Sequence, residues 1–150
     1  MKKIIVSIIF ITCTSFFFCA DNVISEENQT ILESQNKIYG PKSQWVPSKT
    51  QTCLALEAIY KFLNKELTPD WRNRQRKIIQ DQLSSYHVQF VGIIIDGRKS
   101  IHCNFFPNED SFKYDKNSYV FVLDGGASYW RINYDIEKNI CFDFEVNGEA

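Results

Sequence analysis

Apolar and polar residues follow one period before Tyr86 and another after it. Over residues 49–67 the apolar residues recur at the three- and four-residue spacing of a helix with one buried face. Ser48 stands where the capping residue of such a helix is expected, so the pattern predicts a first helix beginning near Lys49. Its apolar stripe consists of Cys53, Leu56, Tyr60, Leu63 and Leu67, widened by Leu54, Ile59 and Ala55 or Ala58.

A second helix is indicated by Thr68-Pro-Asp70. A capping hydroxyl is followed there by proline at the first helical position and by an acid near the positive end of the helix dipole. We expect this helix to reach about Leu83. Its basic residues spread over more than one face and acids flank them, which favours a solvated surface over an anion- or nucleic-acid-binding patch. These basic residues are Arg72, Arg74, Arg76 and Lys77.

From Tyr86 onward, apolar and polar residues alternate, which is typical of strands. Asp96-Gly97 is the expected two-residue turn of a first hairpin. Alternation in the last strand predicts one apolar face, made of Ile140, Phe142, Phe144 and Val146. The predicted strands cover residues 88–95, 100–106, 119–123, 129–136 and 140–146.

These elements predict an α+β domain over residues 45–150. One or two N-terminal helices should pack on a curved antiparallel sheet of four to five strands, in a cystatin-like or NTF2-like arrangement. Leu56 and Leu63 should meet Ile132, Phe142 and Phe144 in its core.

Residues 1–20 have the layout of a secretory signal peptide, in which Lys2 and Lys3 precede an apolar run. A membrane-spanning helix is the competing interpretation, but a span needs roughly 20 apolar residues and this run has about 15. Residues 21–44 are rich in Ser, Glu, Asn and Gln and are predicted to form a flexible linker. We therefore expect an exported protein that is periplasmic, secreted or lipid-anchored to the cell envelope.

Two processing routes remain open at the end of this signal. Ala20 suits general signal peptidase, whereas Cys19 followed by Ala-Asp-Asn resembles the start of a bacterial lipoprotein, whose cysteine is acylated. Phe18 is bulkier than either route prefers.

Charge and cysteine content narrow the classes of partner and site. Without Lys2 and Lys3 the chain has 15 basic and 18 acidic residues. Its net charge of −3 gives no reason to expect nucleic acid or an anionic membrane surface as a partner. The cysteine spacings and the presence of only two histidines argue against a metal site, and no cofactor is expected.

Three cysteines lie in the predicted domain, so at most one disulfide can form among them, and the sequence does not decide whether one does. Cys53 lies on the apolar stripe of the first helix, which favours a buried, inert thiol over a reactive one. The other two are Cys103 and Cys141.

Asp124-Gly-Gly can be interpreted as a phosphate-binding loop, as part of a calcium site or as a bend between two strands. Phosphate loops lead into a helix N-terminus, and here another strand is predicted to follow, which favours the bend. A calcium site formed by Asp124 and Asp135 would lack the dense run of oxygen ligands that calcium requires.

Catalysis has one candidate arrangement. His87 and His102 fall on neighbouring predicted strands, where either could serve as a base for Cys103 or Ser100. Cys103 directly follows His102, so the two side chains should point to opposite faces of the sheet. We expect histidines on an open sheet face and no catalytic residue.

A second arrangement, of paired carboxylates, is weaker. Asp143 and Glu145 lie near Asp135 and Glu137, but acids in this position are more typical of the solvated side of an outer strand.

Several short motifs resemble a family of small exported bacterial proteins without assigned function, many of which look like lipoproteins. The resemblance covers about residues 45–150, with departures at Phe90 and before Cys19. It implies a compartment and a fold but no activity. The motifs are Tyr86-His-Val-Gln-Phe-Val-Gly-Ile, Asp96-Gly-Arg-Lys-Ser-Ile-His-Cys-Asn-Phe-Phe106, Val122-Leu-Asp-Gly-Gly126, Ile132-Asn-Tyr-Asp135 and Val146-Asn-Gly-Glu-Ala150.

We expect a non-catalytic protein-binding module of the cell envelope, of inhibitor or immunity type, with a protein partner. Small size, export, the lack of a catalytic group and an exposed loop over residues 107–117 beside aromatic strands motivate this interpretation. The alternative is a small-ligand-binding or hydrolytic NTF2-like protein that uses the concave sheet face with His87 or His102. A structural envelope protein is a third interpretation. A deep pocket where a histidine and a carboxylate converge would favour the ligand-binding protein, and a filled core with a flat outer sheet would favour the binding module.

Overall fold

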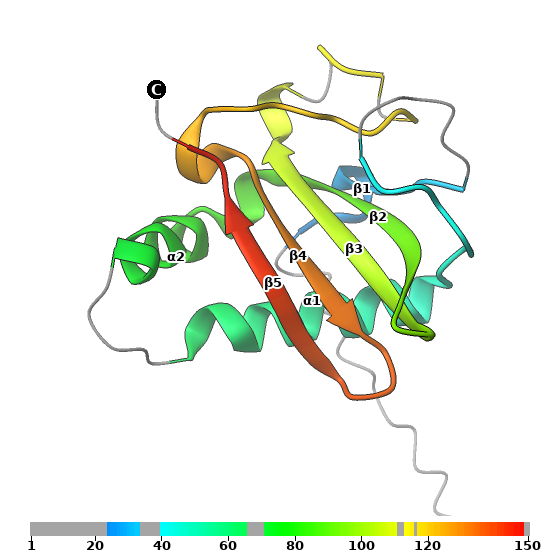
Figure 1. Ribbon diagram of the computed structural model, residues 1–150. Helices are drawn as coiled ribbons and strands as arrows, with labels where there is room; N and C mark the ends of the chain where they lie inside the picture. Colours follow the sequence, from blue (N-terminus) through cyan, green and yellow to red (C-terminus); the bar gives the residue numbers. More distant parts are fainter. Residues whose placement is uncertain (1–23, 34–39, 66–70, 111–112, 116, 149–150) are drawn as a thin grey trace, which may run out of the picture.

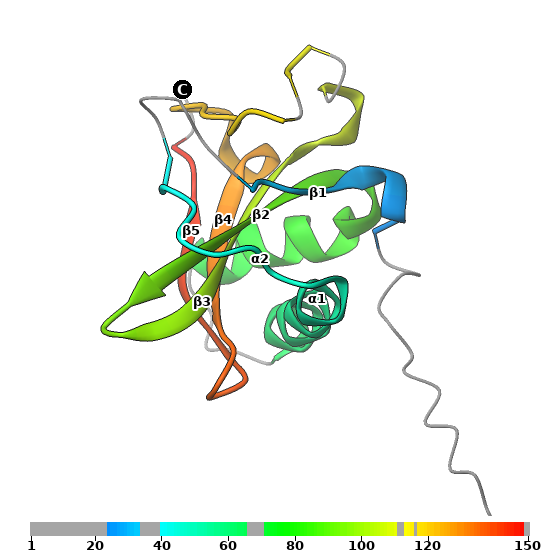
Figure 2. The same cartoon turned by 90° about the vertical axis from the view of Figure 1, so that its right-hand side faces the viewer.

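The computed structural model describes residues 24–33, 40–65, 71–110, 113–115 and 117–148, except for the side chains of residues 71, 72 and 110. Five strands form one open sheet in the order β1-β2-β3-β4-β5, and two helices pack on one of its faces (Figures 1 and 2). The predicted α+β class is confirmed. The elements are β1 (Gln29–Ile31), α1 (Lys49–Asn64), α2 (Trp71–Asp81), β2 (Tyr86–Ile95), β3 (Arg98–Pro107), β4 (Trp130–Asp135) and β5 (Ile140–Val146).

The sheet is mixed, not purely antiparallel as predicted. β1 runs parallel to β2, and the later neighbours pair antiparallel. A parallel pair needs a long crossover connection, which here contains α1 and α2. The predicted hairpin of β2 and β3 is confirmed, and its turn residues Asp96 and Gly97 both have positive φ, as a two-residue hairpin turn requires.

The linker predicted over residues 21–44 is wrong for the part that the structure describes. Ile24 and Leu32 are buried, and the Leu32 N–H donates to Phe90 O at 2.9 Å. Farther along, the Gln44 N–H donates to Gly92 O at 2.8 Å. Polar composition misled the prediction, because a few apolar residues and the unpaired backbone groups of β2 are enough to order these segments.

The start of α1 follows the prediction. Ser48 Oγ accepts from the Gln51 N–H, and Gln51 Oε1 accepts from the Ser48 N–H at 2.8 Å, which completes a capping box. Most of the predicted stripe is buried or partly buried, but Tyr60 is 46% exposed and does not belong to it. Leu67 lies outside the described residues. The buried stripe consists of Thr52, Ala55, Leu56, Ile59 and Leu63.

The basic surface predicted for the second helix is corrected at Arg76. This side chain is buried, its guanidinium donates to Phe62 O and to Lys65 O, and it lies 4.4 Å from the centroid of the Phe62 ring. It therefore helps to satisfy carbonyl groups in the last turn of α1 and at its C-cap, where helical hydrogen bonding ends. Arg74 and Lys77 are exposed as predicted, whereas residues 68–70 and the Arg72 side chain lie outside the described part.

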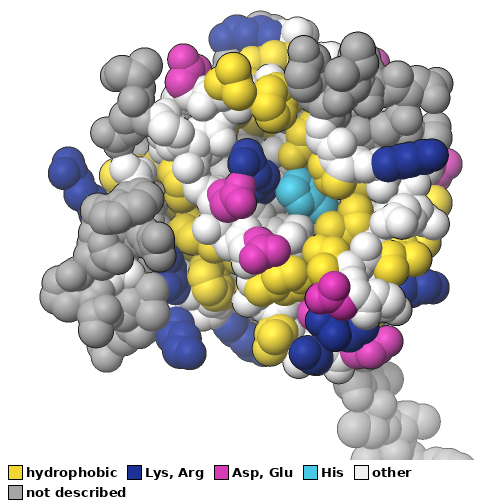
Figure 3. All heavy atoms as spheres, in the orientation of Figure 1, with side chains coloured by type: hydrophobic (Ala, Val, Ile, Leu, Met, Phe, Trp, Pro, Cys, Tyr) yellow, Lys and Arg dark blue, Asp and Glu magenta, His cyan; other side chains and the backbone are white. Residues whose placement is uncertain are grey.

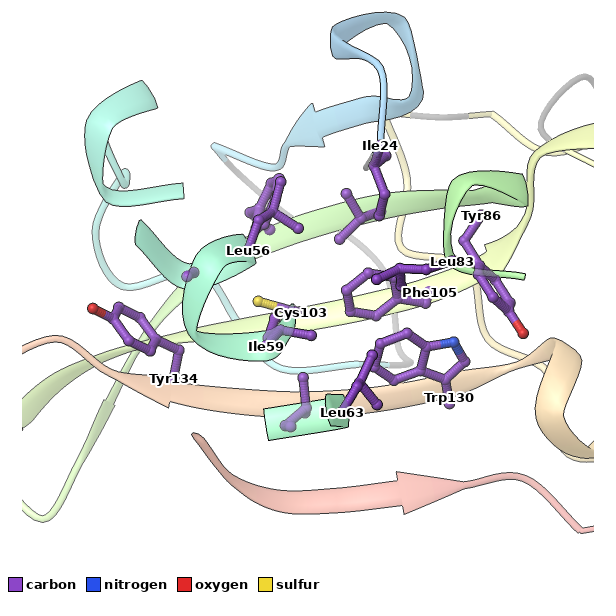
Figure 4. Close-up of a cluster of buried hydrophobic side chains, with 14 of the residues drawn as sticks. Ile24, Leu56, Ile59, Leu63, Leu83, Tyr86, Cys103, Phe105, Trp130 and Tyr134 are labelled. Carbon is purple, nitrogen blue, oxygen red and sulfur yellow. The ribbon is translucent and has the colours of Figure 1, made fainter. Parts of the chain in front are cut away.

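The core fills the space between the helices and the sheet (Figure 4). Phe105 and Trp130 stack with ring centroids 3.7 Å apart, and Tyr86 meets the Trp130 ring edge-on. Leu56 and Leu63 of α1 pack into the same cluster, as predicted.

A β-bulge in β5 interrupts the predicted alternation. Arg131 pairs with Glu145 but Asn133 pairs with Phe142, so β5 contains one extra residue there, and Asp143 has φ 51°. Phe144 and Val146 pack on the core as predicted, whereas before the bulge Phe142 shares the opposite face with Asn133, which corrects its predicted place in the core.

Because of the bulge, we expect Phe144→Ala and Phe142→Ala to lower the free energy of unfolding by different amounts. Phe144→Ala should lower the free energy of unfolding by about 1 to 3 kcal/mol, because the ring packs against Phe62 and Trp130. Phe142→Ala should cost less than about 1 kcal/mol. Urea melts of both variants measure the difference, and a larger loss for Phe142→Ala would contradict the observed register.

Candidate functional site

The outer face of the sheet, defined as the face away from the helices, gathers most of the polar side chains that could form a site. Cross-strand pairs place Gln89 beside Asn104 and His102 beside Asn133. All four residues are buried. In the orientation of Figure 3, a histidine lies in a hollow between acidic, basic and apolar side chains.

Residues 118–122, called the covering segment below, include most of a predicted strand but do not join the sheet. Gln89 Nε2 donates to Ser118 O at 2.8 Å, and the Val120 N–H donates to Gln89 Oε1 at 2.9 Å. Asn104 Nδ2 donates to Val120 O at 2.9 Å. The strand prediction is therefore wrong here, because side-chain amides provide the hydrogen bonds that a neighbouring strand would have made.

His102 belongs to a chain of hydrogen bonds that crosses three elements. Its Nδ1 is 2.8 Å from Asn133 Oδ1, and its Nε2 is 2.9 Å from the Tyr119 hydroxyl. Asn133 Nδ2 donates to Asp143 Oδ2 at 3.3 Å. A carboxylate only accepts, so Asp143 turns the carbonyl of Asn133 toward His102. We assign the proton of neutral His102 to Nδ1, which leaves Nε2 to accept from Tyr119.

Burial keeps both rings of this chain neutral at ordinary pH. It lowers the pKa of His102, an effect that Arg131 increases and that the Asn133 hydrogen bond and Glu145 oppose. Burial also raises the pKa of Tyr119 to about 12. The Tyr119 hydroxyl therefore donates a hydrogen bond, and His102 Nε2 accepts it.

Arg131 connects this chain to the end of β5. Its guanidinium forms an ion pair with Glu145 and donates to Asn147 Oδ1 at 3.4 Å. Asn147 Nδ2 donates to Val122 O at 2.6 Å, so β5 also holds the covering segment.

The predicted candidates do not converge on a catalytic centre. His87 shares the outer face with His102, but it bonds Thr30 Oγ1 at 2.9 Å and stacks on Phe106. Cys103 is buried on the helix side of the sheet, as predicted, and burial raises the pKa of its thiol well above the ordinary value. Ser100 is buried on the outer face.

The cysteines differ from the expectation at Cys53. It is disulfide-bonded, so the prediction of an inert free thiol is wrong, and its partner is neither Cys103 nor Cys141, which are free. Cys19 lies outside the described residues.

The structure agrees with a bend at Asp124-Gly-Gly. Gly125 and Gly126 have φ of 96° and 54°, and the Gly126 N–H donates to Gly148 O at 3.0 Å. A single 3₁₀ turn, Gly126–Ser128, follows and leads into β4, as predicted for residues 129–136. Within the described residues, no group of three or more histidine, cysteine or acidic side chains is placed to hold a metal ion.

Asp135, the other member of the hypothetical calcium pair, stabilises the turn between β4 and β5. Its carboxylate accepts from the Lys138 N–H and from Arg98 Nε, each at 3.0 Å. The Lys138 backbone hydrogen bond lowers the pKa of this carboxyl, and Arg98 adds to the effect.

A separate cavity of about 570 Å³ lies between the start of β2 and the end of β3. Amide, hydroxyl and carboxyl side chains line it, and they include no pair of acid and base. The polar residues of its lining are Gln82, Ser85, Asn108, Glu109 and Ser128.

Comparisons with protein-family models, curated proteins and solved structures find no match to this chain. The resemblance to small exported bacterial proteins therefore stays a prediction. Among the described residues, no helix combines the length and apolar character needed to cross a bilayer.

Gly125→Val should lower stability by about 1 to 3 kcal/mol, because a side chain is strained at positive φ. Its Cβ would also approach the Tyr129 ring to 2.6 Å. Gly148→Val is the matched control, since nothing lies within 4 Å of a Cβ there. Thermal melts measure both variants, and a wild-type melting temperature raised by calcium or phosphate would overturn the bend interpretation.

Asp135→Asn should destabilise the protein at neutral pH. The pKa of Asp135 is lowered in the folded state, so its stabilisation is present above the unfolded-state pKa and is lost as pH falls through the folded-state pKa. Denaturant melts from about pH 7 to about pH 3 should show wild type and variant converging in acid. A pH-independent difference would contradict the charged role of this side chain.

Proposed function

We propose that this chain is an exported, non-catalytic protein-binding module of the cell envelope, of inhibitor or immunity type. The main support for this proposal is the state of His102. Both of its ring nitrogens form hydrogen bonds to side chains of the protein itself. A base in this state has no free lone pair for a substrate. The outer face thus supports recognition at its surface better than chemistry within it.

The proposed contact surface, called the outer patch, combines exposed apolar side chains with an ion pair. Phe121 and Leu123 are both exposed, Leu123 at 80%. Asn147 bonds both Arg131 and the carbonyl groups beside Leu123, so the ion pair of Arg131 and Glu145 lies close to Leu123. Aromatic and apolar anchors beside an arginine are typical of binding hot spots.

The charge of the patch supports a partner with basic side chains. Asp124 and Asp143 are exposed around it, whereas Arg131 and Glu145 neutralise each other in their ion pair. A partner that places lysine or arginine next to an apolar surface would complement both features.

Export is proposed from residues 1–20, whose basic start and apolar run are those of a signal peptide. Anchoring through acylated Cys19 is the alternative to release after Ala20. The cystatin-like or NTF2-like comparison also remains a proposal, since it rests only on helices packed on a curved sheet.

A second candidate, a small-ligand-binding or hydrolytic protein, rests on the orientation of His102 by Asn133 and Asp143. An oriented imidazole is typical of a general base. A ligand would first have to replace the Tyr119 hydroxyl at Nε2.

The outer patch can be tested by affinity capture from envelope extract of the source cell. Leu123→Asp and Arg131→Ala should each lower the retained partner at least about tenfold, the usual scale of a hot-spot residue. Tyr60→Asp is the matched control, because Tyr60 is an exposed aromatic residue on α1. Retention that survives both patch variants but is lost with Tyr60→Asp would move the interface to the helices and refute the outer patch.

A further inference from the structure

Tyr119 packs beside His102 and occupies its Nε2 position with a hydroxyl group. Each side chain is 8% exposed, and the two ring centroids are 5.8 Å apart. Neutral His102 requires a donor at Nε2, because its Nδ1 proton is already donated to Asn133. Tyr119 supplies that donor and so closes the hydrogen-bond chain.

The backbone on both sides of Tyr119 is held independently of His102. Gln89 bonds Ser118 O and the Val120 N–H, and Asn104 bonds Val120 O. Rotation of the Tyr119 side chain away from His102 would give up its contacts with the apolar cluster of Leu32, Val91 and Ile93, but it would leave the hydrogen bonds of the covering segment to the sheet in place.

We propose that Tyr119 is a proton-controlled lid, which closes over neutral His102 and opens to solvent when His102 takes up a proton. This inference goes beyond the proposed binding function and does not depend on it.

Protonation of His102 turns its Nε2 from a hydrogen-bond acceptor into a donor. An imidazolium donates from both nitrogens, so the Tyr119 hydroxyl loses its acceptor and must send its proton elsewhere in a buried position. An open lid lets water solvate both groups.

The charges around His102 set the direction of this response. Arg131 of β4 disfavours the imidazolium, Glu145 of β5 favours it, and Asp143 acts through Asn133. Burial is the largest influence and lowers the pKa of His102 in the closed state, whereas a solvated histidine has a pKa near 6.5. The open state therefore binds more protons, and opening grows as pH falls below about 6.5.

Hydroxyl-radical footprinting of the full chain measures the exposure of individual tyrosines. Labelling of Tyr119 should rise at least about threefold between about pH 7.5 and about pH 5. Two tyrosines are internal controls, because Tyr60 is already exposed and Tyr134 is buried in the core. Neither should change over this range.

Two matched variants assign the response to one of the two histidines in the chain. His102→Gln keeps an acceptor for Tyr119 but does not titrate, and it should abolish the pH response. His87→Gln should preserve it. Flat labelling of Tyr119 in wild type, or a response that survives His102→Gln, would overturn the proposal.

An NMR titration of wild type keeps the proposal falsifiable if a variant does not fold. The Tyr119 ring signals should titrate with the same midpoint as the His102 imidazole, and separate midpoints would refute the lid.

Discussion

The outer face depends on two side-chain amides, Gln89 and Asn104, which form backbone-like hydrogen bonds with residues 118–120. An amide side chain carries both a donor and an acceptor, so it can pair with a crossing peptide that runs outside the sheet. The same contacts satisfy polar groups that would be costly to bury alone. They also hold Tyr119 over His102.

The two faces of the sheet bury different kinds of side chain. The helix side is a stacked aromatic core around Trp130, whereas the outer side combines a smaller apolar cluster with a buried polar layer closed by the covering segment. The Asp143 bulge connects them, because it turns Phe144 toward the core and leaves Asp143 to orient Asn133. The side chains left for a partner are those at the surface of that layer.

Local patterns predicted much of the fold. Ser48 marked the start of α1, and Asp96-Gly97 marked the hairpin of β2 and β3, because both signals act within a few residues. β1 was missed because a three-residue strand in a polar stretch has no period to detect. The bulge at Asp143 was missed because no residue pattern in the sequence identifies a non-glycine residue that will adopt a positive φ.

The candidate site was less predictable, since its contacts join residues distant in the chain. The prediction placed both histidines on an open sheet face, which is wrong because both are buried, and it did not identify Tyr119 as the partner of His102. Alternation predicted that 119–123 was a strand, and it could not show that Gln89 and Asn104 would hold that segment across the sheet. Two amide side chains facing outward on neighbouring strands were the available signal.

Native-state hydrogen exchange at the Val120 amide tests most directly whether side-chain amides close the outer face. Its N–H donates to Gln89 Oε1, although no strand includes it. We predict protection comparable to that of amides within β2 and β3. Exchange at the rate of an unstructured loop, while β2 and β3 stay protected, would show that the covering segment is not held on the sheet.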